Sequence, residues 1–456
     1  MSFHDLYTST TYGKINRRLV RFLQNMLQPR KVSGIKYLLA VVIRFVLLHT
    51  NFRSSIQDRV EISTPLNSWK RLLEGIHLYN RDIDPYSGDL FHESPIILII
   101  CRFLLNHLGP FVEAVFVAMD VLVAYLLYKT AAMYISQIKN EEESKLKKGV
   151  FCKVSENLIV TEEDAQNIPA YVAHSYLFNP YIILNCAGLT TTNFSNLLLA
   201  GVFYSMVKRR QFICVLLLSL IAQQSFYLFT LLVPVCLQFY NFEKTKKCIF
   251  QILITFTVIF AGLLGLCYSI SGSWKFIEST YGVILNVSDL TPNIGLFWYF
   301  FTEMFDHFRA LFISALQINA TVLYLFPLAL HLRNEPIFLS FIIVALTAVF
   351  KSYPSLGDVG FYFSLLPIWK HLFFFMRQTF NITCLLIITS ALGPTVWHLW
   401  IYAGSANANF FFGVTLAFAI AQIFLITDLL FARKKRTFAL KIGLPDDSSG
   451  STLVLD

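Results

Sequence analysis

Apolar runs separated by short polar segments fill most of the chain, from about residue 35 to about residue 431. A helix that crosses a bilayer needs about 20 mainly apolar residues. The pattern therefore predicts an all-α polytopic membrane protein with about 10–12 transmembrane helices. The apolar runs lie near 35–50, 95–109, 112–135, 168–187, 190–207, 212–240, 248–271, 294–305, 309–331, 336–350, 359–376, 380–402 and 409–431.

The polar segments divide the chain into three parts. We predict a basic cytoplasmic leader (1–34), a multi-span membrane domain (35–431) and a cytoplasmic C-terminal tail (432–456). Within the membrane domain, residues 51–94 are too polar to span and are predicted to form the first luminal loop. Residues 137–165 are predicted to form a second hydrophilic loop.

The first apolar run is short and contains Arg44. Such a run is either a retained signal anchor or a cleaved signal peptide. A signal peptide ends in a cleavage site of small residues, whereas the residues that follow this run, 49–53, are bulky. We therefore favour a retained first helix.

The run at 212–240 is long for one crossing and too short for two. Gln223, Gln224 and Pro234 interrupt it, and both of its flanks are basic. Irregular backbone at membrane depth is tolerated when it is buried against protein. The pattern predicts half-helices or a hairpin that returns to the cytoplasm.

The formal net charge is +9, and the position of the basic residues is more informative than their sum. Clusters of Lys and Arg border apolar runs at 14–36, 208–210, 244–247 and 433–436. Cytoplasmic loops have this excess, so we place these segments and both termini in the cytoplasm. A nucleic-acid surface would instead form a basic stripe on one face, so no nucleic-acid partner is expected.

The composition excludes a soluble protein. Hydrophobic residues make up 55% of the chain and charged residues 14%, whereas soluble domains contain about 25% charged residues. So large an apolar share also excludes disorder. The membrane is therefore an expected partner of this chain.

The sequence contains no recognisable catalytic or metal motif. The eight cysteines include no C-x-x-C pair, and no Cys/His set has zinc spacing. A Walker loop, G-x-S-x-G and G-x-G-x-x-G are also missing. We expect no metal, no cofactor and no catalytic residue in this chain. Of the N-x-S/T sequons, only Asn286 is a credible glycosylation site in a luminal loop.

Two acids in the predicted first luminal loop are candidates for chemistry. Asp82 and Asp84 are one residue apart and precede a Pro-Tyr-Ser-Gly turn. Such a pair can coordinate a divalent cation or act as a base, and membrane glycosyltransferases that use lipid-linked sugars place acids in this loop. The alternative is a solvated pair of loop charges.

Segment 289–308 combines polar residues with a dense aromatic band. Asp289 and Asn293 precede the band, and Phe297 and Trp298 begin it. Aromatic rings with a polar edge are typical of the headgroup level of a bilayer. The band also includes ionisable residues, which in membrane segments are either functional or paired inside a bundle: Glu303, Asp306 and His307.

Segment 350–359 joins two apolar runs. Lys351 and Asp358 within it are able to bind a phosphate and an amine or hydroxyl, respectively, or to pair with each other at the interface. We favour the pairing.

Segment 397–411 is rich in aromatic residues, small residues and amides. Gly404 and Ser405 let a ligand approach the backbone closely. Asn407 and Asn409 each offer two amide donors and an acceptor, which suits sugar hydroxyls or a phosphate ester. The alternative is a polar turn between helices.

These segments resemble the class U subunit family of the glycosylphosphatidylinositol (GPI) transamidase. The resemblance extends over nearly the whole chain from residue 52, and residues before about 35 lie outside it. It rests on segments 52–55, 68–71, 85–88, 91–93, 179–181, 289–308, 350–354, 357–359 and 397–411.

The resemblance implies a non-catalytic subunit in the endoplasmic reticulum membrane that binds the GPI glycolipid. A cysteine-protease-like subunit of the same complex would supply the nucleophile, and the fold would resemble the membrane domain of lipid-linked-sugar glycosyltransferases. The lipid-binding residues that it implies are Ser405, Asn407, Asn409, Asp289, Asn293, Phe297 and Trp298.

Two other functions compete with this one. An active dolichol-phosphate-mannose-dependent mannosyltransferase of GPI assembly would use acids such as Asp82 and Asp84. A secondary transporter would need paired broken helices in two halves of the chain, and the sequence does not show such a pair.

Overall fold

The computed structural model describes residues 34–443, and this part of the chain is built from helices and turns without a strand. Six helical stretches within it are long and apolar enough to cross a bilayer, and shorter apolar helices accompany them. The prediction of an all-α polytopic membrane protein is confirmed. The number of 10–12 crossings stays a prediction. The predicted leader, apart from Gly34, and the end of the predicted tail lie outside the described residues.

The first half of the chain forms α3 (Gly34–Leu48), α4 (Phe52–Gln57), α5 (Trp69–Asn80), α6 (Pro95–Leu108), α7 (Val112–Lys147), α8 (Glu162–Leu177), α9 (Pro180–Ala187), α10 (Thr192–Val207) and α11 (Gln211–Gln224). The second half forms α12 (Leu232–Glu243), α13 (Lys246–Ser271), α14 (Lys275–Ile277), α15 (Val283–Asn286), α16 (Phe297–Glu303), α17 (Asp306–Ile318), α18 (Leu325–His331), α19 (Pro336–Phe350), α20 (Leu356–Leu365), α21 (Thr379–Ile401) and α22 (Ala408–Ile442). Short 3₁₀ and π turns connect them: η1 (Pro85–Ser87), η2 (Gly109–Phe111), η3 (Lys153–Leu158), η4 (Phe226–Leu231), η5 (Glu278–Gly282), η6 (Asn319–Leu323) and η7 (Leu366–Phe375).

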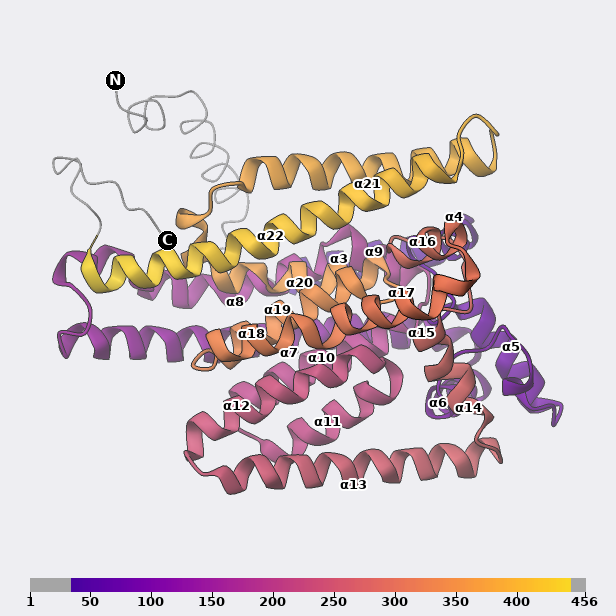
Figure 1. Ribbon diagram of the computed structural model, residues 1–456, viewed down its shortest axis with the longest axis horizontal. Coiled ribbons are helices and arrows are strands. Elements are labelled where there is room, and N and C mark those ends of the chain that lie inside the picture. Colours follow the sequence, from indigo (N-terminus) through magenta and orange to yellow (C-terminus); the bar gives the residue numbers. More distant parts are fainter. Residues whose placement is uncertain (1–33, 444–456) are drawn as a thin grey trace.

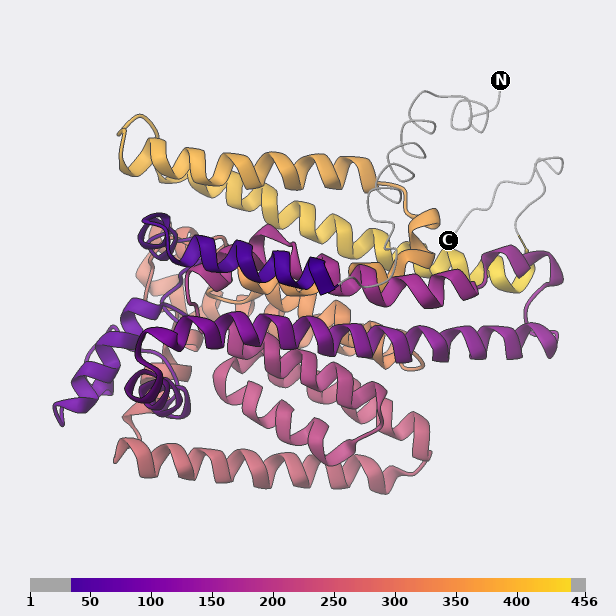
Figure 2. The same ribbon diagram turned by 180° about the vertical axis from the view of Figure 1, so that it is seen from behind.

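The long helices run roughly side by side along one direction, with α13 at one edge of the bundle and α21 at the other (Figures 1 and 2). Helix α7 packs against α8 and α10, and α21 packs mainly along α22. Helix α19 is buried on almost all of its surface, since 13 of its 15 residues are buried. A helix that is apolar all round belongs in the interior of a bundle, and α19 is part of the main core.

One end of the bundle is basic, and we call it the basic end. Arg433 of α22 pairs with Glu335 beside α19 (Nε–Oε2 2.6 Å), and the amide of Asn241 in α12 donates to the carbonyl of Arg333 (2.8 Å). Helices α4, α5, α14 and α16 gather at the opposite end (Figure 1). The assignment of these two ends to the cytoplasm and the lumen stays a prediction.

A buried ion pair ties the first helix to the bundle. Arg44 of α3 is 0% exposed, and its Nε donates to Asp120 of α7 at 2.7 Å. Arg44 Nη1 also donates to the carbonyl of Leu177 (2.8 Å), and the hydroxyl of Tyr176 donates to Asp120 (3.2 Å). The arginine that interrupts the first apolar run therefore joins α3, α7 and α8, and the retention of this helix stays a prediction.

Helix α6 differs from the predicted span at 95–109. Both views show α6 nearly end-on, across the direction of α7 (Figures 1 and 2). The turn at Gly109, where φ is +52°, redirects the chain between the two helices. An apolar run predicts burial in lipid or protein, but it does not predict the direction in which the helix runs.

The predicted hydrophilic loop at 137–165 is helical over much of its length. Helix α7 continues to Lys147, and α8 already begins at Glu162. Arg436 of α22 holds the charged end of α7 in place. Its guanidinium pairs with Glu142 at 2.7 and 2.9 Å, and it also donates to the carbonyl of Leu158.

The run at 212–240 breaks at the two glutamines, whereas Pro234 lies in the first turn of α12 and does not interrupt it. Helix α11 ends at Gln224, Ser225 is extended, and η4 and α12 continue from Phe226. The side chains of Gln223 and Gln224 bond to Cys267 and to the carbonyl of Thr191. Neighbouring segments thus accept the amide N–H groups of both glutamines, whereas the buried Oε1 of Gln224 has no hydrogen-bond partner among residues 34–443.

Candidate functional site

The two aromatic segments that the sequence singles out meet at the end of the bundle opposite the basic end. Helix α16 supplies Tyr299, whose hydroxyl donates to Oδ1 of Asn409 at 2.7 Å. The Tyr299 ring stacks on Phe412 of α22, with 4.3 Å between the ring centroids. Segments about 110 residues apart in sequence therefore form one surface.

Beneath this surface lies an aromatic cluster, which we define as Trp298, Trp397, Trp400 and Phe411. Trp298 of α16 is 3% exposed and packs against Trp400 of α21 and Phe411 of α22. Its indole N–H is buried and has no hydrogen-bond partner among residues 34–443. The cluster fixes the position of the turn between α21 and α22 and leaves one donor unused.

The start of α22 and the turn before it form an exposed polar edge, which we call the amide rim and define as Ser405, Asn407 and Asn409. Asn407 caps α22, because its Oδ1 accepts from the backbone N–H groups of Asn409 (3.1 Å) and Phe410 (3.3 Å). Its two amide N–H donors make no hydrogen bond within the described range. The rim therefore presents donors on a backbone that is held rigidly.

Asp289 lies in a loop that is pinned to the first predicted luminal segment. Its carboxylate accepts from Arg71 (Nη2–Oδ2 2.9 Å) and from the backbone N–H of Thr291 (2.8 Å). Its carbonyl accepts from the hydroxyl of Tyr353 (2.8 Å). Burial alone would raise the pKa of Asp289, but the hydrogen bonds from Thr291 and the charge of Arg71 outweigh burial and lower this pKa. Asp289 is thus an anion that organises the loop.

Asn293 and Phe297 lie in the interior. Asn293 is 0% exposed; its Oδ1 accepts from the N–H of Gly295 (2.8 Å) and its Nδ2 donates to the carbonyl of Thr291 (3.2 Å). Phe297 packs with Phe301 in a small core. Both residues shape the loop that leads into α16, and a direct lipid contact by either remains a prediction.

The acid pair of the first luminal segment is not assembled into a site. Asp84 begins the turn η1, where its Oδ1 accepts from the N–H of Tyr86 at 2.9 Å. Asp82 is exposed in a left-handed backbone conformation (φ +56°). Between residues 34 and 443, no three His, Cys, Asp or Glu side chains gather in a way that would hold a metal ion.

The charged residues of two other segments, 350–359 and 303–307, differ in whether they form ion pairs. Lys351 pairs with Asp358 at 2.6 Å, as we favoured from the sequence, and Asp358 also closes the capping box of α20 with Ser355. Glu303, Asp306 and His307 are exposed at the turn between α16 and α17 and form no ion pair within the described residues. Asn286 is exposed at the end of α15, so its predicted glycosylation is sterically open.

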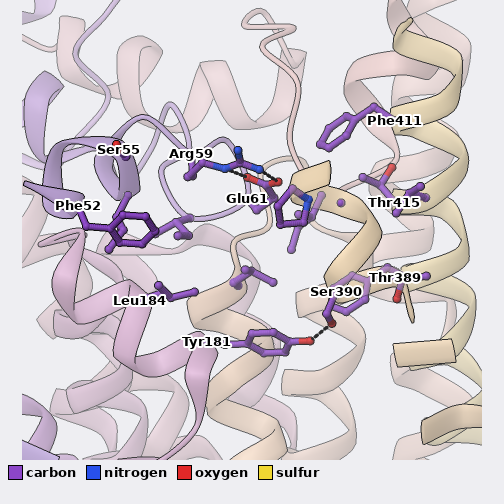
Figure 3. A pocket seen from close by; sticks show the side chains of 18 residues that line it. Phe52, Ser55, Arg59, Glu61, Tyr181, Leu184, Thr389, Ser390, Phe411 and Thr415 are labelled. Carbon is purple, nitrogen blue, oxygen red and sulfur yellow. Dashed lines mark hydrogen bonds and ion pairs between the residues drawn. The ribbon is translucent and has the colours of Figure 1, made fainter. Parts of the chain in front are cut away.

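A feature that the sequence did not indicate is a mainly apolar cavity of about 300 Å³ next to the aromatic cluster (Figure 3). Its walls come from α4, α9, the start of α20, α21 and α22, and Phe411 is shared with the aromatic cluster. Arg59 and Glu61 form an ion pair in its wall. No local sequence motif indicates this cavity, because residues from distant segments between 52 and 418 line it.

A buried acid in the segment before α6 gives a pH-dependent prediction. Glu93 is 5% exposed, accepts from the hydroxyl of Thr191, and has its pKa raised by burial from 4.5 to about 8. Between these two pH values the folded state binds a proton that the unfolded state has lost, so stability falls as the pH rises through this window. The slope is at most about 1.4 kcal/mol per pH unit.

Glu93→Gln, which keeps a neutral side chain of the same size at every pH, is expected to remove this slope. The measurement is the thermal unfolding of the purified protein and of the variant from pH 4 to pH 9. The difference in stability between the two proteins should change between about pH 4.5 and pH 8. Parallel curves over this range would show that the pKa of Glu93 is the same in the folded and unfolded states, which would contradict the raised pKa.

The described fold and site define a multi-pass helical membrane protein with a polar and aromatic surface at one end of its bundle. Residues 38–418 match the family model described as GPI transamidase subunit PIG-U. The chain is 39% identical over 428 residues to the human protein named GPI-anchor transamidase component PIGU, covering 91% of this chain and 97% of the human one. It is 28% identical over 388 residues to the Saccharomyces cerevisiae GPI transamidase component GAB1, covering 84% and 90% of the two chains. The chain belongs to the PIG-U family.

Proposed function

We propose that this protein is the subunit of a GPI transamidase that binds the GPI lipid and positions it for attachment to the C-terminus of proteins. The proposal places the chain in the endoplasmic reticulum membrane, with the amide rim on the luminal side and the basic end in the cytoplasm. Its partners are the other transamidase subunits, including a cysteine-protease-like subunit that supplies the nucleophile. The names of its relatives support the assignment to this complex.

The observation on which the lipid-binding role rests is the amide rim above the aromatic cluster. Asn407 holds its acceptor oxygen in the helix cap and keeps its two N–H donors available. Donors fixed in this way suit the phosphate and hydroxyl oxygens of a glycolipid. The aromatic rings below them belong at the level where a lipid headgroup meets the acyl chains.

Positioning alone accounts for a useful contribution to the reaction. Holding the amine of GPI beside the thioester of another subunit converts a two-molecule encounter into a step within one complex. This contribution needs rigid placement and no nucleophile from this chain. Helix α22 provides the rigidity, because Asn407 caps it and Phe411 anchors its first turn.

Asn407→Asp is the sharpest test of the proposal. Aspartate caps a helix as well as asparagine does, so α22 keeps its first turn, but the amide donors are replaced by a negative charge. We expect GPI attachment to fall by about tenfold, the size of a lost hydrogen bond to a charged group. The measurement is the amount of a GPI-anchored reporter on cells whose own subunit is replaced by the variant.

Asn106→Asp provides the matched control, because Asn106 is an exposed asparagine of α6 at the same end of the bundle. It introduces the same charge far from the amide rim and is expected to leave attachment unchanged. Copurification of the other subunits with each variant checks that the complex still assembles. Full attachment in Asn407→Asp cells would contradict the assignment of the lipid to this rim.

A further inference from the structure

The apolar cavity has one charged end and one polar end (Figure 3). At the charged end, Arg59 donates twice to Glu61, from Nε to Oε2 at 3.1 Å and from Nη2 to Oε1 at 2.7 Å. At the other end, the hydroxyls of Tyr181 and Ser390 share a hydrogen bond. Most of the remaining lining is apolar, so water has few partners in the space between these ends.

The ion pair at the charged end leaves one edge of the guanidinium unused. Nη1 of Arg59 makes no hydrogen bond in the part of the chain that the structure describes, and the Arg59 side chain is 24% exposed. A guanidinium has five N–H donors and binds phosphate oxygens well. Glu61, with a side chain only 7% exposed, compensates the charge of Arg59 and holds its orientation.

We propose that this cavity holds one acyl chain of the GPI lipid, and that Nη1 of Arg59 donates to the phosphate of the same lipid. The inference rests on the proposed function and adds a second contact region to the amide rim. Phe411 connects the two regions, because it lines the cavity and also packs against Trp298 and Trp400. The acyl chain and the glycan would thus lie on opposite sides of the aromatic cluster.

The size of the cavity favours an acyl chain over other occupants. A helix with its side chains is about 10–12 Å across, which is too wide for a cavity of about 300 Å³. An apolar cavity of about 150 Å³ in another protein stays dry and binds benzene, so twice that volume suits about a dozen carbon atoms of a chain. A slender and flexible hydrocarbon meets these limits.

Helix α21 lies at one edge of the bundle and forms the outer wall of the cavity (Figure 1). Thr389, Ser390 and Gly393 face the cavity, whereas Ile388 and Leu392 on the other side of α21 are 53% and 42% exposed. Gly393 adds no side chain where the helix passes Glu61; a Cβ built there would lie 3.9 Å from Oε1. Pro394 follows it and interrupts the helix hydrogen bonding.

The first test fills the cavity in the intact complex. Thr415→Phe and Val414→Trp each add a ring from α22 to the lining, while Leu416→Phe adds the same ring on the exposed side of the helix. The probe is a GPI analogue with a photoreactive diazirine near the end of one acyl chain. We expect cross-links to α9, α21 and α22, reduced about tenfold by both filling variants and unchanged by Leu416→Phe.

The second test removes the phosphate contact. Arg59→Met is expected to lower the cross-linking yield about tenfold. Arg53→Met is the matched control, because Arg53 is a neighbouring arginine of similar exposure that pairs with Glu113 and does not line the cavity. A phosphatidylcholine analogue with the same diazirine chain, used in parallel, should label the cavity residues much less than the GPI analogue.

The results separate this inference from the proposed function. Unchanged cross-linking in both filling variants overturns the acyl-chain site, even if Asn407→Asp lowers GPI attachment. The inference is also overturned if the phosphatidylcholine analogue labels the cavity as strongly as the GPI analogue and if Arg59→Met does not change this labelling. The occupant of the cavity would then be bulk lipid. Normal GPI attachment in Asn407→Asp cells, together with a loss of cross-links in Thr415→Phe, would support the acyl-chain site in the cavity. It would contradict the proposal that the amide rim binds the lipid.

Discussion

Asp120→Leu is expected to destabilise the protein by about 3–5 kcal/mol, the usual result of leaving a buried charge without its partner. Arg44 is 0% exposed, and Asp120 is its only carboxylate partner within the described residues. The carbonyl of Leu177 accepts one of its N–H groups but cannot neutralise the charge. The loss should appear as a lower temperature of thermal unfolding of the purified protein in detergent.

The double variant Arg44→Leu/Asp120→Leu distinguishes a charge effect from a packing effect. Replacing both members of a buried ion pair by apolar residues is often neutral or stabilising, so the double variant should recover most of the lost stability. It also makes the first apolar run continuous, which suits a span in lipid. An unfolding temperature as low as that of Asp120→Leu alone would show that the pair acts through shape.

The class of fold and several local features were predictable because they depend on neighbouring residues. Apolar runs that recur along the chain predict a membrane protein, and a chain that crosses lipid in such runs forms helices. The two glutamines at 223–224 predict the break that ends α11. Lys351 and Asp358 are seven residues apart across the start of α20, close enough for a pairing to be anticipated. Each of these predictions needs only the local sequence and the properties of lipid.

The parts that were not predictable depend on packing between distant segments. Arg71 and Asp289 are 218 residues apart, and Arg436 and Glu142 are 294 apart. Asn293 has a polar side chain suited to a ligand, yet the loop consumes both of its amide groups in internal hydrogen bonds. The apolar run likewise predicts that α6 is a helix, but it does not predict that α6 runs across the direction of α7. Only the three-dimensional arrangement separates residues that face a ligand from those that support the site.

Trp298→Ala is expected to cost about 3–5 kcal/mol locally and to lower GPI attachment strongly. Removing a buried tryptophan leaves a cavity that the surroundings fill only in part. Trp298 is 3% exposed and contacts Trp400, Phe411 and Phe412, so α16 would lose these contacts with α21 and α22 and keep those of Tyr299. The measurement pairs thermal unfolding of the purified complex with the amount of the GPI-anchored reporter on cells.

Trp298→Phe distinguishes two roles of this side chain: support of the amide rim by its ring, and a hydrogen bond from its indole N–H to the lipid. Phenylalanine keeps an aromatic ring in the cluster and removes the indole N–H, which has no partner in the part of the chain that the structure describes. If Trp298 only supports the rim, the phenylalanine variant retains most of its stability and its attachment activity. If the N–H donates to the lipid, attachment falls while the unfolding temperature stays near that of the native protein. Full attachment in Trp298→Ala cells would contradict both roles, because the amide rim would then function without the ring that holds it.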